Sequence, residues 1–273
     1  MAAKKADNSQ AGQASHRIAV ILGAGGSNRR LLNQLLPLLG QGRNIEMQGV
    51  FIEEADVQYA AELPFVQELC RVTFSVREFT SDQFERALVL RMHTARRAID
   101  VLARRTGVRH SFRSVRGSVI GLLRETASSS DMTVFEPARL YASQAVRPSA
   151  ARQQIVVVVS DSASSLAVMR AASHLASGAN HRIATLIFPA PGEDTDALRE
   201  QAARIQGSRP SLSRLVEGGD IGALVRAVRN MGASILVLPA SAALLDTQAL
   251  RQLRDQLRCP ICMVRRWDNY QQD

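Results

Sequence analysis

Apolar residues along the chain gather in short continuous runs that are separated by small-residue turns and by longer amphipathic stretches. Runs that are apolar on nearly every residue are typical of strands covered on both faces, as in parallel sheets. The clearest runs are Arg17–Leu22, Ile235–Leu238 and Ile261–Val264, and Ile45–Ile52 is predicted as a further strand. A helical pattern joins the last two runs, so Ala233–Arg265 predicts a strand–helix–strand crossover. The whole pattern predicts an α/β fold in which parallel strands alternate with helices.

The best-defined helical pattern runs from Asp82 to Arg105. One face collects apolar residues and the opposite face collects basic ones. The apolar set is Leu88, Met92, Ala95, Ile99 and Leu102, and the basic set is Arg86, His93, Arg97 and Arg104. We favour a helix that covers a sheet and leaves its charged face in water; a docking face for an acidic partner is the second interpretation. Just before this helix, the alternation in Val72–Val76 predicts a half-exposed strand or hairpin arm.

The chain also repeats its own pattern. The run that contains Ile18 returns at Ile155, an offset of 137 residues, and the same offset carries Val50–Phe51 onto Ile187–Phe188. A second match, at an offset of 102 residues, carries the end of the first half onto Pro239–Ala240. Self-similarity of this kind predicts two copies of one α/β unit.

We expect the first unit at residues 17–138 and the second at residues 153–267, joined by a linker at residues 139–152. Residues 1–16 and 268–273 are predicted to be tails, because polar segments of this kind bury too little apolar surface to fold. Each unit should hold a parallel sheet flanked by helices. Too few residues separate the end of the first sheet from the second unit for a fourth helix and a fifth strand, so the first unit is predicted to be truncated at its C-terminal edge.

The second half carries a strand, a small-residue turn with serine and a helix, followed by GGDIGAL from Gly218, ASILVL from Ala233 and CPICMV from Cys259. This order resembles the universal stress protein family, in its tandem form and with a degenerate nucleotide motif. The resemblance implies Rossmann-like units with five-stranded parallel sheets and dimerisation through the last strand. It also implies ATP binding in one subclass.

ATP-binding members of that family share a G-x2-G-x9-G-[S/T] loop after their fourth strand, where glycines let backbone N–H groups approach the phosphates. Here the corresponding segment begins Pro239-Ala240-Ser241, and no glycine follows Gly232. Proline also lacks the N–H that a phosphate would use. We therefore expect both units to have lost the usual ATP site, and we expect no cofactor.

Two strand-to-helix turns stay as candidate anion or nucleotide sites. The first is glycine-rich, in the context of an anion bound at a helix N-terminus, although a tight turn needs glycines in any case. The second is most simply a helix N-cap, with a ligand role as the alternative. The residues are Gly23, Gly25, Gly26 and Ser27 in the first turn and Ser160, Asp161 and Ser162 in the second.

Catalytic and metal-binding patterns are weak. Cys259 and Cys262 have the spacing of a redox motif, but they open a strand and not a helix that would lower a thiol pKa, so we expect structural roles. The five histidines show no pairing at metal-ligand spacing. No nucleophile elbow and no locally paired carboxylates occur, and we expect no enzymatic activity and no metal site.

Composition narrows the functional classes further. The formal net charge of +9 comes almost wholly from arginine, which favours anionic partners, although nucleic acid is not the favoured one. No apolar stretch reaches the roughly 20 residues of a membrane helix, so no membrane insertion is expected. The three cysteines make no disulfide framework, and this fits a reducing cytoplasm.

We therefore expect a cytoplasmic, stress-associated regulatory or scaffold protein that is not an enzyme and acts by binding a protein partner; an acidic partner is the second interpretation of the basic helix face. A homodimer is expected through a free edge strand at Pro260–Val264, with Ile261 and Met263 at the contact. The alternative is a nucleotide-responsive sensor for ATP or AMP, or a weak nucleotide hydrolase, that uses the Gly23–Ser27 loop.

Overall fold

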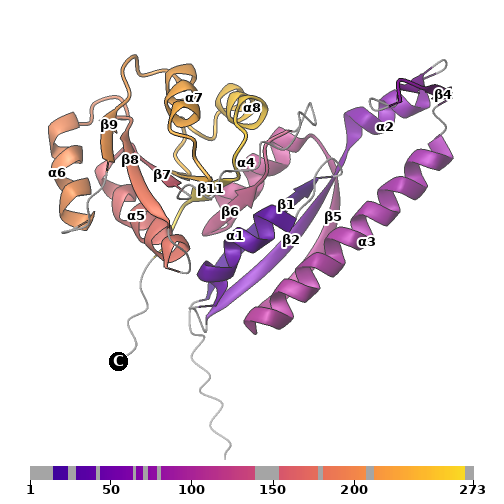
Figure 1. Ribbon diagram of the computed structural model, residues 1–273, viewed down its shortest axis with the longest axis horizontal. Coiled ribbons are helices and arrows are strands. Elements are labelled where there is room, and N and C mark those ends of the chain that lie inside the picture. Colours follow the sequence, from indigo (N-terminus) through magenta and orange to yellow (C-terminus); the bar gives the residue numbers. More distant parts are fainter. Residues whose placement is uncertain are drawn as a thin grey trace, which may run out of the picture.

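The computed structural model describes residues 15–23, 29–40, 44–63, 66–69, 73–78, 81–138, 154–177, 181–206 and 212–267 (Figure 1). The first half contains β1 (His16–Gly23), α1 (Arg29–Leu39), β2 (Ile45–Glu54), α2 (Ala55–Glu62), β3 (Gln67–Leu69), β4 (Val76–Glu78), α3 (Ser81–Thr106), β5 (Arg109–Gly117), α4 (Val119–Ser129) and β6 (Met132–Phe135). The second half contains β7 (Gln154–Val159), α5 (Ser162–Ala176), β8 (Arg182–Ile187), α6 (Thr195–Gln206), β9 (Leu212–Leu215), α7 (Ile221–Asn230), β10 (Ile235–Pro239), α8 (Thr247–Gln256) and β11 (Ile261–Val264).

Nine strands form one continuous sheet in the order β5-β2-β1-β6-β11-β10-β7-β8-β9. The strands of each half run parallel to one another, and β6 and β11 meet antiparallel in the middle. Outward from this seam, β6-β1-β2-β5 mirrors β10-β7-β8-β9, and β11 has no counterpart among the described strands of the first half. The expected α/β class with a mostly parallel sheet is confirmed. The strands of the two half-sheets run in opposite directions. The carboxyl ends of the strands in one half therefore lie on the side of the sheet where the strands of the other half begin.

Helices cover both faces of the sheet and bury two cores. The first core lies under α1, α3, α5 and α6, with Leu35, Ile99 and Val168 among its buried residues. The second lies under α4, α7 and α8. Strand β7 shows why an apolar run serves both: Val157 points into the first core and Val158 into the second, since successive side chains of a strand alternate between faces.

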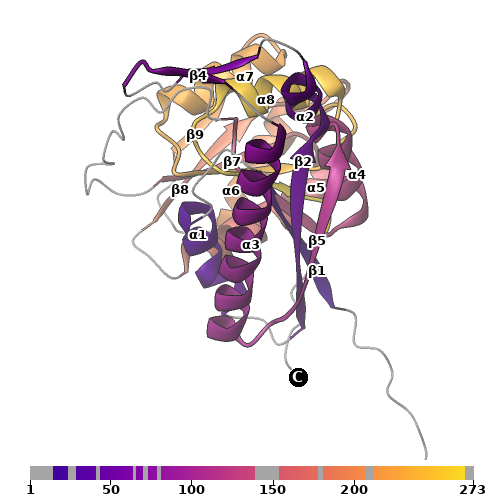
Figure 2. The same cartoon turned by 90° about the vertical axis from the view of Figure 1, so that its right-hand side faces the viewer.

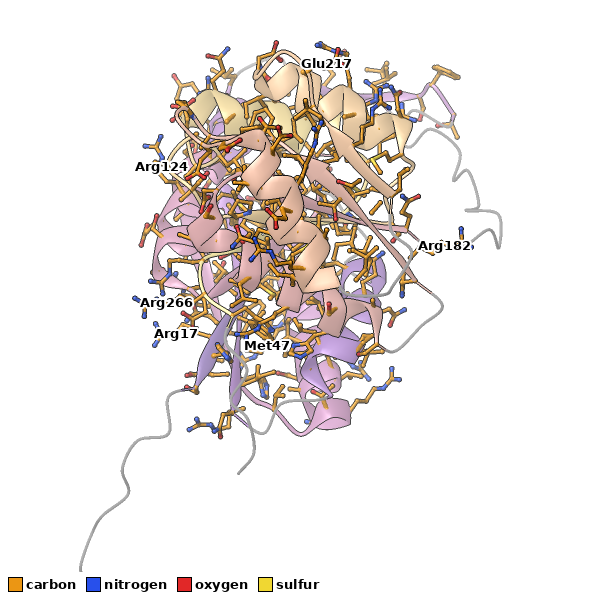
Figure 3. All side chains as sticks on the ribbon, turned by 90° about the vertical axis from the view of Figure 1, so that its left-hand side faces the viewer. Arg17, Met47, Arg124, Arg182, Glu217 and Arg266 are labelled. Atoms are coloured by element: carbon orange, nitrogen blue, oxygen red, sulfur yellow. The ribbon has the colours of Figure 1, made fainter. Side chains whose placement is uncertain are left out.

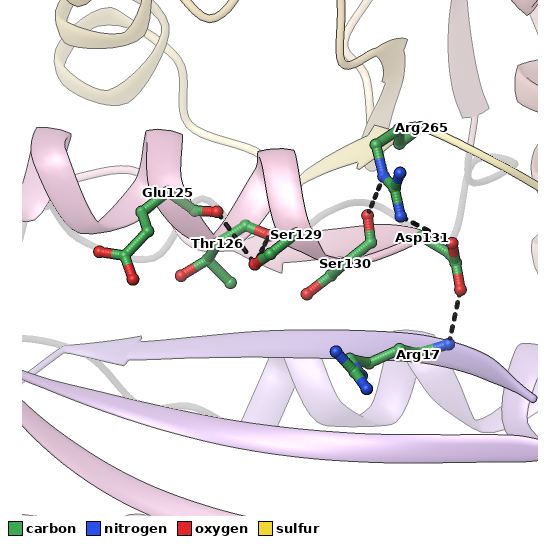
Figure 4. Close-up of polar contacts among 7 residues, drawn as sticks. All are labelled: Arg17, Glu125, Thr126, Ser129, Ser130, Asp131 and Arg265. Carbon is green, nitrogen blue, oxygen red and sulfur yellow. Dashed lines mark hydrogen bonds and ion pairs between the residues drawn. The ribbon is translucent and has the colours of Figure 1, made fainter.

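The seam is fixed at one end by the carboxylate of Asp131 (Figure 4). Asp131 Oδ2 accepts a hydrogen bond of 2.9 Å from the backbone N–H of Arg17, and Oδ1 accepts one of 3.1 Å from Arg265 Nη2. Arg265 Nε also donates to the Ser130 carbonyl at 2.9 Å. The backbone N–H groups of Arg265 and Arg266 donate to the Asp131 carbonyl, and Arg17 and Arg266 lie near each other in Figure 3. Asp131 thus links β1 of the first half to the end of β11.

Trp267 packs just beyond the seam, where it joins both halves. Its ring stacks on that of His16 with 4.5 Å between centroids, and its Nε1–H donates to His174 Nδ1 at 2.8 Å. Burial, then the charges of His16 and Arg170, lowers the pKa of His174. His174 is therefore held in the neutral form that leaves Nδ1 free to accept.

The position of β11 corrects the expected dimer edge. Ile261 and Met263 are fully buried, and β11 pairs with β6 on one side and with β10 on the other. Within the described chain, the partner of this strand is therefore the truncated end of the first half and not a second molecule. A homodimer stays a prediction, but it needs another surface.

The segment before α3 differs from the expected strand at Val72–Val76. Strands β3 and β4 form a short antiparallel hairpin, and β4 begins only at Val76, while Val72 lies outside the described residues. Phe74 has φ 53, a left-handed conformation that ends the extended backbone there. The hairpin and α2 extend beyond the sheet alongside the first turns of α3 (Figure 1).

None of the described helices is long and apolar enough to cross a membrane.

Candidate functional site

The first predicted turn is described only at its start. Gly23 ends β1, and a Cβ added there would meet nothing within 4 Å, so packing does not require glycine at this position. Gly25, Gly26 and Ser27 lie outside the described residues. The anion site expected in this loop therefore stays a prediction.

The second predicted turn is a helix cap that is satisfied by its own residues. Asp161 is the N-cap of α5, and its Oδ1 accepts from the backbone N–H of Ser164 at 2.7 Å. Its Oδ2 accepts from Ser164 Oγ at 2.7 Å and from Ser160 Oγ at 3.4 Å, and Ser162 Oγ donates to Glu193 Oε2 at 3.3 Å. A carboxylate thus stands at the helix N-terminus where an anion would bind, and its charge opposes phosphate.

Aspartate caps recur along the same edge of the second half-sheet. Asp220 caps α7 and Asp246 caps α8, each by accepting from backbone N–H groups. Hydrogen bonds from the backbone of Gln248 and Ala249 lower the pKa of Asp246, because they favour the charged carboxylate. Because α5, α7 and α8 all follow parallel strands, the three capping aspartates lie along one carboxyl edge of the second half-sheet.

The loop after β10 is closed by its own packing. The backbone N–H of Ala240 donates to the Val264 carbonyl at 2.9 Å, and those of Leu244 and Leu245 donate to the Ser241 carbonyl. The Leu244 side chain is buried in the second core. Phosphate loops instead present free N–H groups to a ligand.

A cavity of about 240 Å³ lies at the carboxyl ends of β2 and β5, between α2 and α3. Its polar end is formed by Glu53, which accepts from Ser114 Oγ at 2.6 Å and lies 3.6 Å from Arg116 Nε. Leu88 and Met92 of α3 line its apolar wall. Ligands of open α/β sheets bind at the carboxyl ends of strands, and this cavity lies at such a position. No local pattern in the sequence predicts this cavity, because Glu53 simply follows the last apolar residue of a strand.

The surface of α3 and β5 is strongly basic, and we call it the arginine surface. Residues 81–117 contain nine arginines and three acidic residues, a net +6 of the chain's +9. Only Arg116 among the nine makes an ion pair with a carboxylate of the described chain. Three aliphatic side chains lie among these charges, with exposed fractions of 48% for Val89, 68% for Leu90 and 49% for Val101. The α3 pattern predicted from sequence is confirmed, but β5 and its arginines were not recognised as part of the same surface.

The two cysteines of the predicted redox spacing are buried, and neither forms a disulfide. Burial raises the pKa of the Cys262 thiol, so the reactive thiolate is disfavoured. No group of three or more histidine, cysteine, aspartate or glutamate side chains in the described ranges is placed to hold a metal ion.

No protein-family model and no curated protein matches the chain. Solved structures do match. A universal stress protein from Archaeoglobus fulgidus DSM 4304 is 9% identical over 91% of this chain and 98% of its own, with a TM-score of 0.48. A protein of the universal stress protein family from Burkholderia pseudomallei is 28% identical over 43% of this chain and 98% of its own, with a TM-score of 0.31. A universal stress protein in complex with cAMP is 25% identical over 42% of this chain and 98% of its own, with a TM-score of 0.33. The resemblance to universal stress proteins seen in the sequence is thus found again among solved structures.

Proposed function

We propose that this protein is a non-enzymatic, stress-associated regulatory or scaffold module that binds an acidic protein partner on the arginine surface. The observation that carries the proposal is the set of eight arginines on α3 and β5 that form no ion pair with a carboxylate of the described chain, together with exposed aliphatic side chains. By contrast, the arginines of α6 pair with neighbouring acids, Arg199 with Asp196 and Arg204 with Glu200. Arginines that pair with no carboxylate of the described chain are available to pair with the carboxylates of a partner.

The aliphatic residues favour a protein over nucleic acid. Leu90 and Val101 gain nothing from contact with phosphates, whereas binding sites for single-stranded nucleic acid interleave basic with aromatic side chains. The two aromatic residues of α3 and β5, Phe84 and Phe112, are partly buried. A partner that offers both carboxylates and apolar groups matches both parts of this surface.

Loss of the usual ATP site is part of the proposal. It is supported by the aspartate caps at the carboxyl edge of the second half-sheet and by the closed loop after β10. The alternative, a sensor or weak hydrolase of nucleotides, places ATP or AMP in the Gly23–Ser27 loop. Because the structure of a universal stress protein with cAMP is among those similar to this chain, cAMP belongs in the same assay.

A photo-crosslinking residue placed at Leu90 tests the proposed partner surface. Leu212 of β9, which is 60% exposed, is the matched control at the other end of the sheet. Acidic proteins should be captured at Leu90 and lost in the double variant Arg97→Glu, Arg104→Glu. Equal capture at both positions, or capture that survives the charge reversal, would contradict the proposal.

Thermal unfolding with ATP and magnesium, AMP or cAMP separates the nucleotide alternative. We expect no change in Tm, since a ligand stabilises only the state that binds it. A shift of several degrees that Gly25→Val abolishes would replace our proposal with the sensor function.

A further inference from the structure

Strand β5 leaves a long free edge at the end of the sheet. It pairs with β2 over all nine of its residues, and its other side has no strand beside it in the described chain. At the opposite end of the sheet, β9 has only four residues, so the edge that it offers for pairing is short. Since backbone N–H and C=O groups of a strand point alternately to either side, about half of those in β5 face outward without a strand partner.

Arginines flank this edge on both faces of the sheet. Asp100 marks the flank of α3 that contacts β5, because its Oδ1 lies 2.9 Å from His110 Nε2. Arg96 and Arg104 lie one helical turn to either side of Asp100, on the same flank and exposed. In Figure 2, α3 stands between α1 on one side and β5 on the other.

The second row of arginines lies on the other face. Phe112 points toward Ile99 of α3, since both would contact a Cβ added at Gly49. Side chains of a strand alternate, so Arg109 and Arg113 point to the opposite face, where both are exposed. The free edge therefore runs between two rows of positive charge, one from α3 and one from β5 itself.

We propose that an acidic, extended segment of the partner adds to the sheet as a strand beside β5. This inference rests on the proposed function and names the form that the partner takes at the arginine surface. The outward backbone groups of β5 pair with the backbone of the segment. Carboxylates on one face of the added strand meet Arg96 and Arg104, and those on the other face meet Arg109 and Arg113.

Charge decides against a second copy of this chain at the same edge. Pairing of β5 with itself would bring Arg109, Arg113 and Arg116 from both molecules to one seam, six positive charges in all. Like charges that face each other across strands oppose pairing. An acidic strand neutralises the same arginines, so the arrangement both prevents self-association and selects the partner.

A synthetic peptide tests this mode of binding with the full-length protein. The probe is a fluorescent peptide as long as β5, in which pairs of glutamates alternate with pairs of valines so that both faces carry carboxylates. Two further versions carry N-methyl groups on alternate backbone amides, one on the odd and one on the even residues. A strand that adds to an edge uses only one of these sets, so one version should bind at least about tenfold more weakly and the other about as well as the parent.

Charge variants provide the second measurement by fluorescence anisotropy. Arg109→Glu with Arg113→Glu should weaken binding at least about tenfold, and a glutamine version of the peptide should lose as much. The control is Arg214→Glu with Arg226→Glu, which makes the same charge change on exposed residues of β9 and α7 and should leave binding within about twofold. Circular dichroism establishes that both double variants fold.

The outcomes separate this inference from the proposed function. Strand addition is overturned if both N-methylated peptides lose affinity equally, or if neither loses affinity relative to the parent peptide. This holds even if crosslinking at Leu90 still captures an acidic protein. Binding of single-stranded DNA at the same ionic strength with equal affinity overturns the protein partner as well. Dimerisation of the unliganded protein that Arg109→Glu abolishes would assign the edge to a second copy instead.

Discussion

Removal of the Asp131 carboxylate should loosen the seam between the two half-sheets. Asp131→Ala deletes two hydrogen bonds to a charged acceptor, one from the Arg17 backbone and one from the Arg265 guanidinium. Such bonds contribute about 1.5–3 kcal/mol each in favourable settings. The side chain of Asp131 is 17% exposed and that of Arg265 34%, so water replaces part of this loss. We therefore expect a decrease of about 2–3 kcal/mol in the free energy of unfolding.

Thermal and urea unfolding followed by circular dichroism measure this effect. For a chain of this size, the expected loss corresponds to a decrease in Tm of about 5–10 °C. Asp131→Asn keeps an acceptor for the Arg17 N–H and should cost about half as much. The control is Asp255→Ala. The exposed carboxylate of Asp255 lies 3.9 Å from Arg254, and its removal should lower the free energy of unfolding by less than about 0.5 kcal/mol. A change in Tm below about 1 °C for Asp131→Ala would refute the reasoning.

Other predictions concern pH and packing. Burial lowers the pKa of His174 below 6.5 in the folded protein, so the unfolded chain takes up a proton before the folded chain does as the pH falls. The contribution of His174 to the free energy of unfolding is therefore fully present above pH 6.5 and should be lost as the pH drops below it. His174→Gln should flatten this fall in urea titrations, and His181→Gln should remove a further part, since burial lowers that pKa too. Gly49→Ala should cost about 1–3 kcal/mol by forcing a Cβ to 2.9 Å from Phe112 under α3. In contrast, Gly121→Ala on the exposed side of α4, where an added Cβ would meet only Ser118 Cβ at an ordinary contact distance of 3.8 Å, should stabilise by about 0.5–1 kcal/mol in the same assay.

Local patterns in the sequence predicted the elements whose side chains decide their own structure. The uninterrupted apolar run of β7 and the periodic α3 both occur where expected, with α3 extended by one residue at each end. In the sequence, only Ser111–Val115 of strand β5 is predicted as a strand, between the arginines Arg109 and Arg116. The structure extends it to nine residues because β2 supplies backbone partners along its whole length. Such tertiary pairing is not visible in a window of sequence.

The site was less predictable than the fold for the same reason. The Asp161 cap is a local signal and was recognised as a cap. The seam joins residues 132–135 to residues 261–264, and no local feature of Ile261 or Met263 distinguishes a strand paired within the chain from one paired between molecules. The arginine surface combines a helix and an edge strand whose charges look, taken separately, like ordinary solvated residues.

The antiparallel seam also bears on how the two halves can change over evolutionary time. When two identical subunits meet across a two-fold axis, every substitution appears on both sides at once, so neither side can specialise alone. Here the two sides of the seam are encoded by different codons of one gene. Selection can therefore lengthen α3 and charge β5 in the first half while the second half keeps the closed loop after β10. Each chain therefore carries one long basic edge and one short edge, and offers a single copy of the long edge to any ligand that recognises it.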